Sequence, residues 1–167
     1  MEKPSPIVGH RVDKSALISL EKGKIPPQAV DLEEVVLGAM MIDKKGVDEV
    51  IDILHPDVFY KDSHKYIYEA IFKLFESSEP VDLLTVSSQL KKDGKLEACG
   101  GDFYLIKLTQ KVASSAHIEF HARIILQKYI QRSLIKISSE IIEDSYDETK
   151  DVFDLLDNAE AKLYEVT

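Results

Sequence analysis

Apolar side chains recur every three or four positions along most of this chain, which is the spacing of one face of an α-helix. The first stripe starts at Gln28, directly after Pro26-Pro27, a pair that favours a helix start. A second, short helix follows Gly46 and ends at His55-Pro56, because the residue before proline avoids the α region. Similar stripes predict further helices over residues 62–77, 82–93 and 103–110.

Three residues carry specific predictions within this pattern. Gly38 lies inside the first helix, where glycine costs about 1 kcal/mol relative to alanine, and we interpret it as a point of close approach by another helix. Asp82 and Asp62 precede the fourth and third helices and are predicted to be their N-caps. The inward face of the third helix is predicted to consist of Ile67, Ala70, Ile71, Leu74 and Phe75.

Residues 102–167 contain no glycine and no proline, so little interrupts the backbone there. Ser114 or Ser115 can cap a long helix that reaches about Tyr146, roughly 50 Å at 1.5 Å per residue. Polar residues 145–149 form the one plausible turn, and an amphipathic helix from Val152 to about Leu163 follows. The pattern predicts an antiparallel helical hairpin after a compact bundle, an all-α fold.

The long helix carries two apolar stripes, which is one more than a single neighbouring helix can cover. The broad stripe includes Ile118, Ile125, Tyr129, Leu134, Ile137 and Ile141. The second stripe consists of Phe120, Ile124, Ile135, Ile142 and Tyr146. We interpret the second stripe as a surface for self-association or for a bound protein. The alternative is that the bundle of the same chain covers it.

Charge is distributed unevenly along the 167 residues. The formal net charge is −9, and residues 140–167 hold ten acidic residues and two lysines. Proteins that bind nucleic acid usually present a basic stripe, because neutralising phosphates releases counterions. No such stripe occurs here, so this chain is not predicted to be a main DNA-binding surface. The acidic run from Glu140 to Asp157 is interpreted as a solvated face, with a basic partner as the alternative.

Several features place the chain among cytoplasmic proteins. Its longest apolar stretch, from Val35 to Ile42, is far shorter than the roughly 20 residues that span a bilayer, so no membrane segment is predicted. The N-terminus has no apolar core of a signal peptide, and Cys99 is the single cysteine, which excludes an intramolecular disulfide. Residues 1–24 mix Pro, Gly, Ser and charges and are predicted to be a disordered tail.

Motifs for catalysis or cofactor binding are lacking. The Gly-Lys pairs at residues 23–24 and 94–95 lack the other residues of a phosphate-binding loop. His55, Asp57, Asp62 and His64 could together hold a metal in a small metal-dependent hydrolase, and His117 with His121 has the spacing of a ligand pair. Capping and surface roles explain the same residues more simply. No catalytic, cofactor-binding or metal-binding residue is therefore predicted.

Four segments, in order, resemble the N-terminal domain of the DnaB family of bacterial replicative helicases. They are Pro26-Pro27 with Glu33, Leu37-Gly38, Met41 and Asp43; Phe59-Tyr60 with His64, Ile67 and Tyr68; Pro80-Val81-Asp82 with Thr85, Leu90, Gly94, Leu96, Gly100-Gly101, Tyr104-Leu105 and Leu108; and Ser115-Ala116-His117-Ile118 with Ala122, Ile124-Ile125 and Arg132. The sequence departs from the family pattern at His117, where asparagine is commoner, and at His121, where tyrosine is frequent. The likeness covers about residues 25–167.

The resemblance implies a subunit of a homohexameric, ATP-driven helicase that unwinds DNA at the replication fork. In that family the N-terminal domains pair through their hairpins, and the collar they build recruits primase. A motor domain, absent from this sequence, binds ATP, Mg and single-stranded DNA. Together with the apolar pattern, this predicts a globular bundle over residues 25–112 and a helical hairpin for dimerisation over residues 113–167. A free-standing helical adaptor remains the alternative to a helicase domain.

Overall fold

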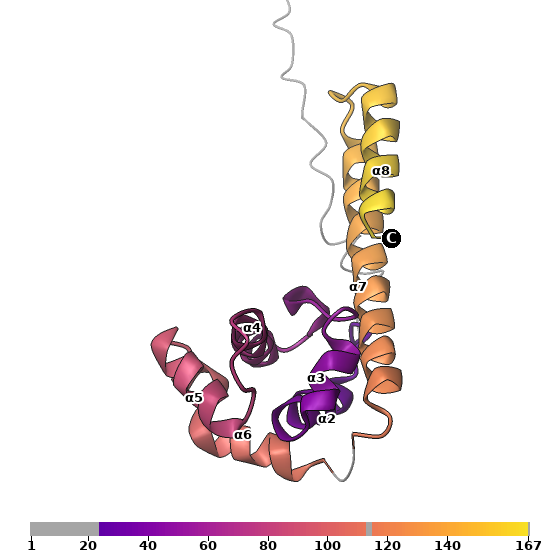
Figure 1. Cartoon of the computed structure of the whole chain (residues 1–167). Helices are drawn as coiled ribbons and strands as arrows, with labels where there is room; N and C mark the ends of the chain where they lie inside the picture. Colours follow the sequence, from indigo (N-terminus) through magenta and orange to yellow (C-terminus); the bar gives the residue numbers. More distant parts are fainter. Residues whose placement is uncertain (1–23, 113–114, 167) are drawn as a thin grey trace, which may run out of the picture. The chain divides into compact units, whose positions relative to one another are not determined.

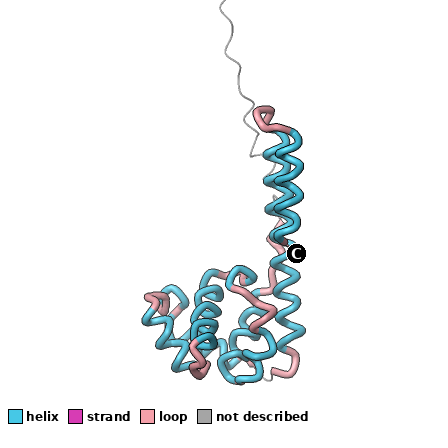
Figure 2. The backbone as a smooth tube through the Cα atoms, turned by 45° about the horizontal axis from the view of Figure 1, so that its top comes forward, coloured by secondary structure: helices cyan, strands magenta, loops and turns pink. Residues whose placement is uncertain are grey.

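The computed structural model describes residues 24–112 and 115–166, and this part of the chain contains helices and no strand. The all-α prediction is confirmed, and Figures 1 and 2 show the arrangement of the helices. No described helix combines the length and the apolar character needed to cross a membrane. In chain order the elements are α2 (Val30–Ile42), α3 (Lys44–Val50), η1 (Pro56–Val58), α4 (Asp62–Glu76), α5 (Leu83–Lys92), η2 (Glu97–Cys99), α6 (Gly101–Gln110), α7 (Ile118–Tyr146) and α8 (Val152–Glu165).

Helix α2 is the central element of a compact unit that runs from Pro27 to Gln131. It packs against α3, α4, α5 and α6, and residues 36–41 are all buried. Tyr68 and Phe59 are the largest side chains of the core, and both are fully enclosed. The Tyr68 hydroxyl donates to the carbonyl oxygen of Leu54 at 2.8 Å, and burial raises its pKa to about 12. The polar end of this large side chain is therefore satisfied inside the core.

Gly38 lies where α2 and α6 meet. A Cβ atom built at this residue would lie 2.2 Å from the carbonyl oxygen of Leu108 and 2.6 Å from a methyl group of Val112. Both distances are far below van der Waals contact, so no larger residue fits without moving the α6 backbone. The predicted close approach of a second helix at Gly38 is confirmed.

The cap of α5 agrees with the sequence, and the cap of α4 does not. Asp82 accepts a hydrogen bond from the Thr85 N–H at 2.9 Å, while the Thr85 hydroxyl oxygen accepts one from the Asp82 N–H at 2.9 Å. This reciprocal pair is a capping box. Asp62, in contrast, is the first residue of α4, and Lys61 occupies the N-cap without a side-chain bond. The prediction for Asp62 was wrong because the helix starts one residue earlier, at the Lys61 carbonyl that accepts from His64.

The buried face of α4 agrees with the prediction at four of five residues. Ile67, Ala70, Ile71 and Leu74 are buried as predicted, whereas Phe75 is 38% exposed. Phe75 lies in the last turn of α4, next to the loop of residues 77–81, and the core ends one residue earlier. Its ring instead forms part of a surface hollow.

Substituting Asp82→Ala should lower the free energy of unfolding by about 1 kcal/mol, the usual cost of an N-cap. The Thr85 N–H loses its acceptor at the same time, but it lies at the exposed end of the helix and can bind water. Chemical denaturation followed by circular dichroism measures the difference. Asp62→Ala is the matched control, and a cost at Asp62 equal to that at Asp82 would contradict this assignment of caps.

The compact unit continues past the bundle boundary predicted at residue 112. Ile118, Ala122 and Ile125, on one face of the first part of α7, are buried in the core of the unit. Helix α7 starts at Ile118 rather than at Ser114 or Ser115; Ser114 lies outside the described residues. The Ser115 hydroxyl donates to the Asp43 carboxylate at 2.6 Å, and hydrogen bonds from this hydroxyl and the Lys45 N–H lower the Asp43 pKa. Ser115 therefore joins the connection before α7 to the start of α3.

Residues 132–166 form a separate unit, an antiparallel hairpin made of the remainder of α7 and of α8 (Figures 1 and 2). The turn lies where the sequence predicts it, with the Asp147 carboxylate accepting bonds from the N–H and hydroxyl of Thr149. Asp151 then caps α8 by accepting from the Phe153 and Asp154 N–H groups. The predicted turn and second hairpin helix are confirmed.

Candidate interaction surface of the hairpin

The hairpin encloses no core of its own. No residue between 132 and 166 is buried, although this segment holds many large apolar side chains. Two helices that touch along one line can shelter only the side chains between them, and here even those remain accessible to solvent. Much apolar surface of the hairpin therefore faces water in a single chain.

The residues of the second stripe of α7 are exposed to different degrees. Phe120 is 65% exposed, Tyr146 67%, Ile135 42% and Ile142 36%, while Ile124 is partly buried. Within the hairpin, α8 covers a different side of α7, where Ile137 and Ile141 are partly buried. Ile135, Ile142 and Tyr146 thus remain open on the side of α7 that α8 leaves uncovered.

Helix α8 adds a second set of exposed apolar side chains, which the sequence reasoning did not assign to an interface. Their helical periodicity was visible in the sequence, but their exposure depends on how α8 meets α7. The face that rests on α7 contains Leu155 and Ala159, which are partly buried. The exposed set consists of Val152, Phe153, Leu156, Leu163 and Tyr164.

Ion pairs hold the two helices of the hairpin together. Lys162 of α8 contacts Glu140 at 2.9 Å and Asp144 at 3.7 Å, both on α7, and Lys150 pairs with Asp144. Hydrogen bonding to Lys150 lowers the pKa of Asp144, and bonding to Glu140 raises the pKa of Lys162. Because all these side chains are partly exposed, the pairs set the register of the helices more than they stabilise them. The acidic run is therefore in part internally neutralised.

A buried polar cluster in the compact unit joins three helices. The Glu33 carboxylate of α2 is 1% exposed and accepts from the Tyr60 N–H at 3.0 and 3.1 Å. His64 of α4, fully buried, lies 2.9 Å from Glu33 through Nδ1 and 2.6 Å from the Tyr104 hydroxyl through Nε2. Nδ1 of His64 therefore faces the Glu33 carboxylate and Nε2 faces the Tyr104 hydroxyl, whose oxygen also lies 3.4 Å from the Glu34 carboxylate. Every polar group of this chain of bonds is satisfied.

Glu34, which is 7% exposed, lies beside the same cluster. It pairs with Lys111, which lies just after α6. Burial works to raise the pKa of Glu34, but hydrogen bonding and charge attraction from Lys111 outweigh it and leave the pKa lowered. Since the folded-state pKa lies below the ordinary value, this pair contributes stability at neutral pH and loses it as the pH falls through the lowered value. Burial and Glu34 also raise the pKa of the Tyr104 hydroxyl, which keeps it a donor.

The four residues considered as a metal site are not brought together. His64 is committed to Glu33 and Tyr104, whereas His55, Asp57 and Asp62 are exposed. Within residues 24–112 and 115–166, no group of three His, Cys, Asp or Glu side chains is placed to hold a metal ion, and this includes the surroundings of His117 and His121. The sequence pattern of the metal hydrolase alternative is thus explained by one buried histidine and three surface residues.

The residues of the buried cluster, Glu33, His64 and Tyr104, belong to the motifs that resemble replicative helicases. A family model described as the DnaB-like helicase N terminal domain matches residues 25–127. The chain belongs to this family. The helicase resemblance is therefore confirmed, and in this chain three residues of its motifs, far apart in sequence, meet in the polar cluster.

Relatives within the DnaB family support the same assignment. The chain is 40% identical over 163 residues to the replicative DNA helicase DnaB of Rhodothermus marinus, covering 96% of this chain and 17% of that protein. It is 38% identical over 150 residues to the replicative DNA helicase DnaC of Bacillus subtilis, covering 90% of this chain and 33% of that protein. The chain thus spans between a sixth and a third of the length of these helicases.

Solved structures agree with the fold. The N-terminal domain of DnaB helicase from Mycobacterium tuberculosis matches with a TM-score of 0.81 and 32% identity, over 86% of this chain and 100% of that one. A DnaB-like replicative helicase, whose structure was described together with its interactions with primase, matches with a TM-score of 0.69 and 25% identity over 83% of this chain and 30% of that one. The chain has the fold of a DnaB N-terminal helicase domain.

Proposed function

We propose that this DnaB-family domain assembles a replicative helicase by pairing subunits through the hairpin of α7 and α8. The observation that supports this is the absence of any buried residue between positions 132 and 166. Exposed apolar side chains on both helices gain about 25 cal/mol for each Å² of apolar surface removed from water. An identical hairpin offers the same apolar side chains in return and can satisfy both copies at once.

The pairing surface in this proposal consists of the second stripe of α7 and the exposed apolar side of α8. Phe120, Ile124, Ile135, Ile142 and Tyr146 are the α7 residues assigned to it. The internal ion pairs of Lys162 and Lys150 reduce the repulsion between two acidic hairpins that come together. In the proposed assembly, these pairs of subunits form a homohexamer.

The wider activity proposed for the whole protein follows from the family. A motor domain beyond this chain hydrolyses ATP with Mg and moves along single-stranded DNA, in the cytoplasm, while the N-terminal domains recruit primase. The description of primase interactions for a structural relative supports that partner. The N-terminal domain itself is proposed to have no catalytic role.

Pairing is tested by replacing Ile135→Asp and Ile142→Asp together. Two carboxylates on the exposed side of α7 would have to be desolvated at the interface, so the dimer should weaken by at least a hundredfold. Sedimentation equilibrium of the 167-residue chain measures the dissociation constant, and circular dichroism checks that the helices persist. Both isoleucines are solvent-accessible in the single chain, so the fold should tolerate the change.

The matched control is Asn158→Asp with Ala161→Asp on α8, which adds the same two charges at exposed positions without removing large apolar side chains. Its dissociation constant should stay within about threefold of the parent, because only long-range repulsion between exposed charges changes. A parent chain that remains monomeric at millimolar concentration, or equal weakening by both variants, would refute the pairing surface.

A further inference from the structure

A surface hollow of about 710 Å³ lies in the compact unit, between the start of α3 and the end of α4. Its apolar surface comes from Val47 of α3, Phe75 of α4, and Val81 in the loop that follows. Val47 is 2% exposed, so it lies at the base, while Phe75 is 38% exposed. Most of the other lining residues are exposed, so the hollow is shallow and open to solvent.

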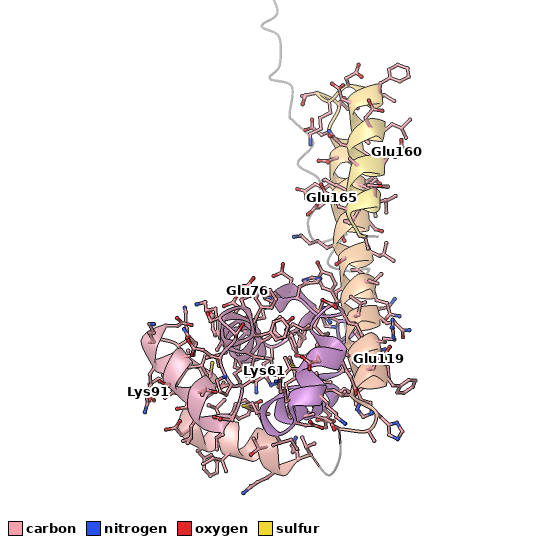
Figure 3. The ribbon with its side chains drawn as sticks, in the orientation of Figure 1. Lys61, Glu76, Lys91, Glu119, Glu160 and Glu165 are labelled. Atoms are coloured by element: carbon pink, nitrogen blue, oxygen red, sulfur yellow. The ribbon has the colours of Figure 1, made fainter. Side chains whose placement is uncertain are left out.

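Acidic side chains gather around this hollow. Asp48, Glu76 and Glu79 line it together with a single cation, Lys44; Glu76 is labelled in Figure 3. Among the described residues, none of these four side chains takes part in an ion pair within 4.0 Å. Glu34 and Asp93, elsewhere in the same unit, are each paired with a lysine. The hollow thus combines an apolar base with negative charge that this chain leaves unneutralised.

The backbone on both sides of the hollow is held by hydrogen bonds. At the end of α4, Ser78 adopts a left-handed conformation with φ 55°, and the Glu79 N–H donates to the Leu74 carbonyl at 2.9 Å. This bond closes the helix end and sets the direction of Glu79, and Pro80 restricts the next residue. On the opposite side, Asp43 caps α3 through the Lys45 N–H at 3.0 Å. The backbone of the hollow is thus set by the chain itself, while the side chains of Asp48, Glu76 and Glu79 are exposed and can turn toward a ligand.

We propose that this hollow binds a short basic segment of a partner protein, placing an arginine or lysine among Asp48, Glu76 and Glu79 and an aliphatic side chain against Val47, Phe75 and Val81. Anionic ligands, including nucleic acid, are disfavoured by the three carboxylates. The long apolar stem of arginine or lysine suits a site with an apolar base and a charged rim. This contact is separate from the hairpin and does not rest on subunit pairing.

The test uses a fluorescent ten-residue peptide made of leucine, alanine and three arginines, and a second peptide in which glutamines replace the arginines. Binding to the 167-residue chain is followed by fluorescence anisotropy, and the contacted residues by amide NMR shifts. The arginine peptide should bind at least about fivefold more tightly, which two or three partly exposed charge pairs supply. The amide shifts should be concentrated in residues 44–48 and 75–81.

Charge variants give the decisive comparison. Glu76→Gln with Glu79→Gln should weaken binding of the arginine peptide by about fivefold, and weaken binding of the glutamine peptide little. The control, Asp57→Asn with Glu97→Gln, removes two exposed carboxylates outside the hollow and should leave the affinity within twofold. Phe75→Ala should weaken both peptides, because it removes the apolar contact, and circular dichroism confirms that the variant is folded.

Three results would overturn the proposal. One is equal affinity for the two peptides, and another is equal weakening by the control variant. The third is displacement of the peptide when the protein concentration is raised to the point at which the chain self-associates. In that case the hollow is part of a contact between copies of this chain.

Discussion

Gly38→Ala should lower the free energy of unfolding by about 3 kcal/mol, the upper part of the range for overpacking a core. The new methyl group would lie 2.2 Å from the Leu108 carbonyl oxygen, a backbone atom that cannot rotate away. Helix α6 must therefore shift, and contacts along its buried side, including Leu105, are lost. Thermal and urea denaturation followed by circular dichroism measure the loss.

Whether Gly38→Ala lowers or raises the free energy of unfolding shows whether helix packing or helix propensity dominates at this residue. In an exposed helix the same substitution would stabilise the protein by about 1 kcal/mol, because alanine is the better helix former. Gly46→Ala in α3 provides the comparison, since its added methyl group would lie 3.2 Å from both the Ala39 carbonyl oxygen and the Ile118 Cδ1 atom. We expect a change within about 1 kcal/mol there. Stabilisation by Gly38→Ala would mean that α2 and α6 do not meet as described.

Glu33→Ala should cost about 3 kcal/mol or more, because each buried donor that loses its acceptor costs about 1 to 3 kcal/mol. The substitution leaves the Tyr60 N–H and Nδ1–H of His64 without their acceptor, and His64 is fully buried. A small cavity between α2 and α4 adds to the loss. Urea denaturation gives the free energy, and faster amide exchange at Tyr60 should report the broken bond.

The neighbouring residue is the control for Glu33. Glu34→Ala removes the same charge from the same helix, but its partner Lys111 is 37% exposed and can turn to water. Its cost should be smaller, about 1 to 2 kcal/mol, because Glu34 is itself buried but the lysine that it leaves can be hydrated. Similar losses at the two positions would show that the Glu33 cluster contributes no more than the Glu34–Lys111 pair. The loss caused by Glu33→Gln should lie between those of Glu33→Ala and Glu34→Ala, since the amide keeps the shape of the side chain and loses its charge.

Much of the fold could be predicted from local features of the sequence. The periodic stripes predicted each helix from α2 to α8, the Asp82-Thr85 spacing fits the capping box that was found, and polar residues 145–149 predicted the hairpin turn. Gly38 was predicted to be a point of close approach because glycine destabilises a helix interior relative to alanine. Each of these features depends on residues within about one helical turn of each other, so a short segment of the sequence is enough to predict it.

Features that depend on distant residues could not be predicted in this way. Glu33, His64 and Tyr104 stand 31 and 40 residues apart, so periodicity places each on its helix without showing that they meet. The bundle boundary predicted at residue 112 left out Ile118, Ala122 and Ile125, which are buried in the core of the compact unit. Phe75 was assigned to the core from its spacing along α4, but burial depends on the neighbouring segments, and these leave it exposed.

The sequence by itself determined the helices, their order and the family. The prediction for α3 was wrong at both ends, because this helix spans Lys44–Val50 rather than starting after Gly46 and reaching His55-Pro56. The sequence also determined that the long helix has more apolar surface than one neighbour can cover. Only the tertiary structure decided which apolar faces are covered, which polar groups meet inside the bundle, and where three carboxylates gather around a hollow. Helix formation depends on neighbours three and four residues apart, whereas burial and electrostatic pairing depend on distances in space between segments remote in sequence.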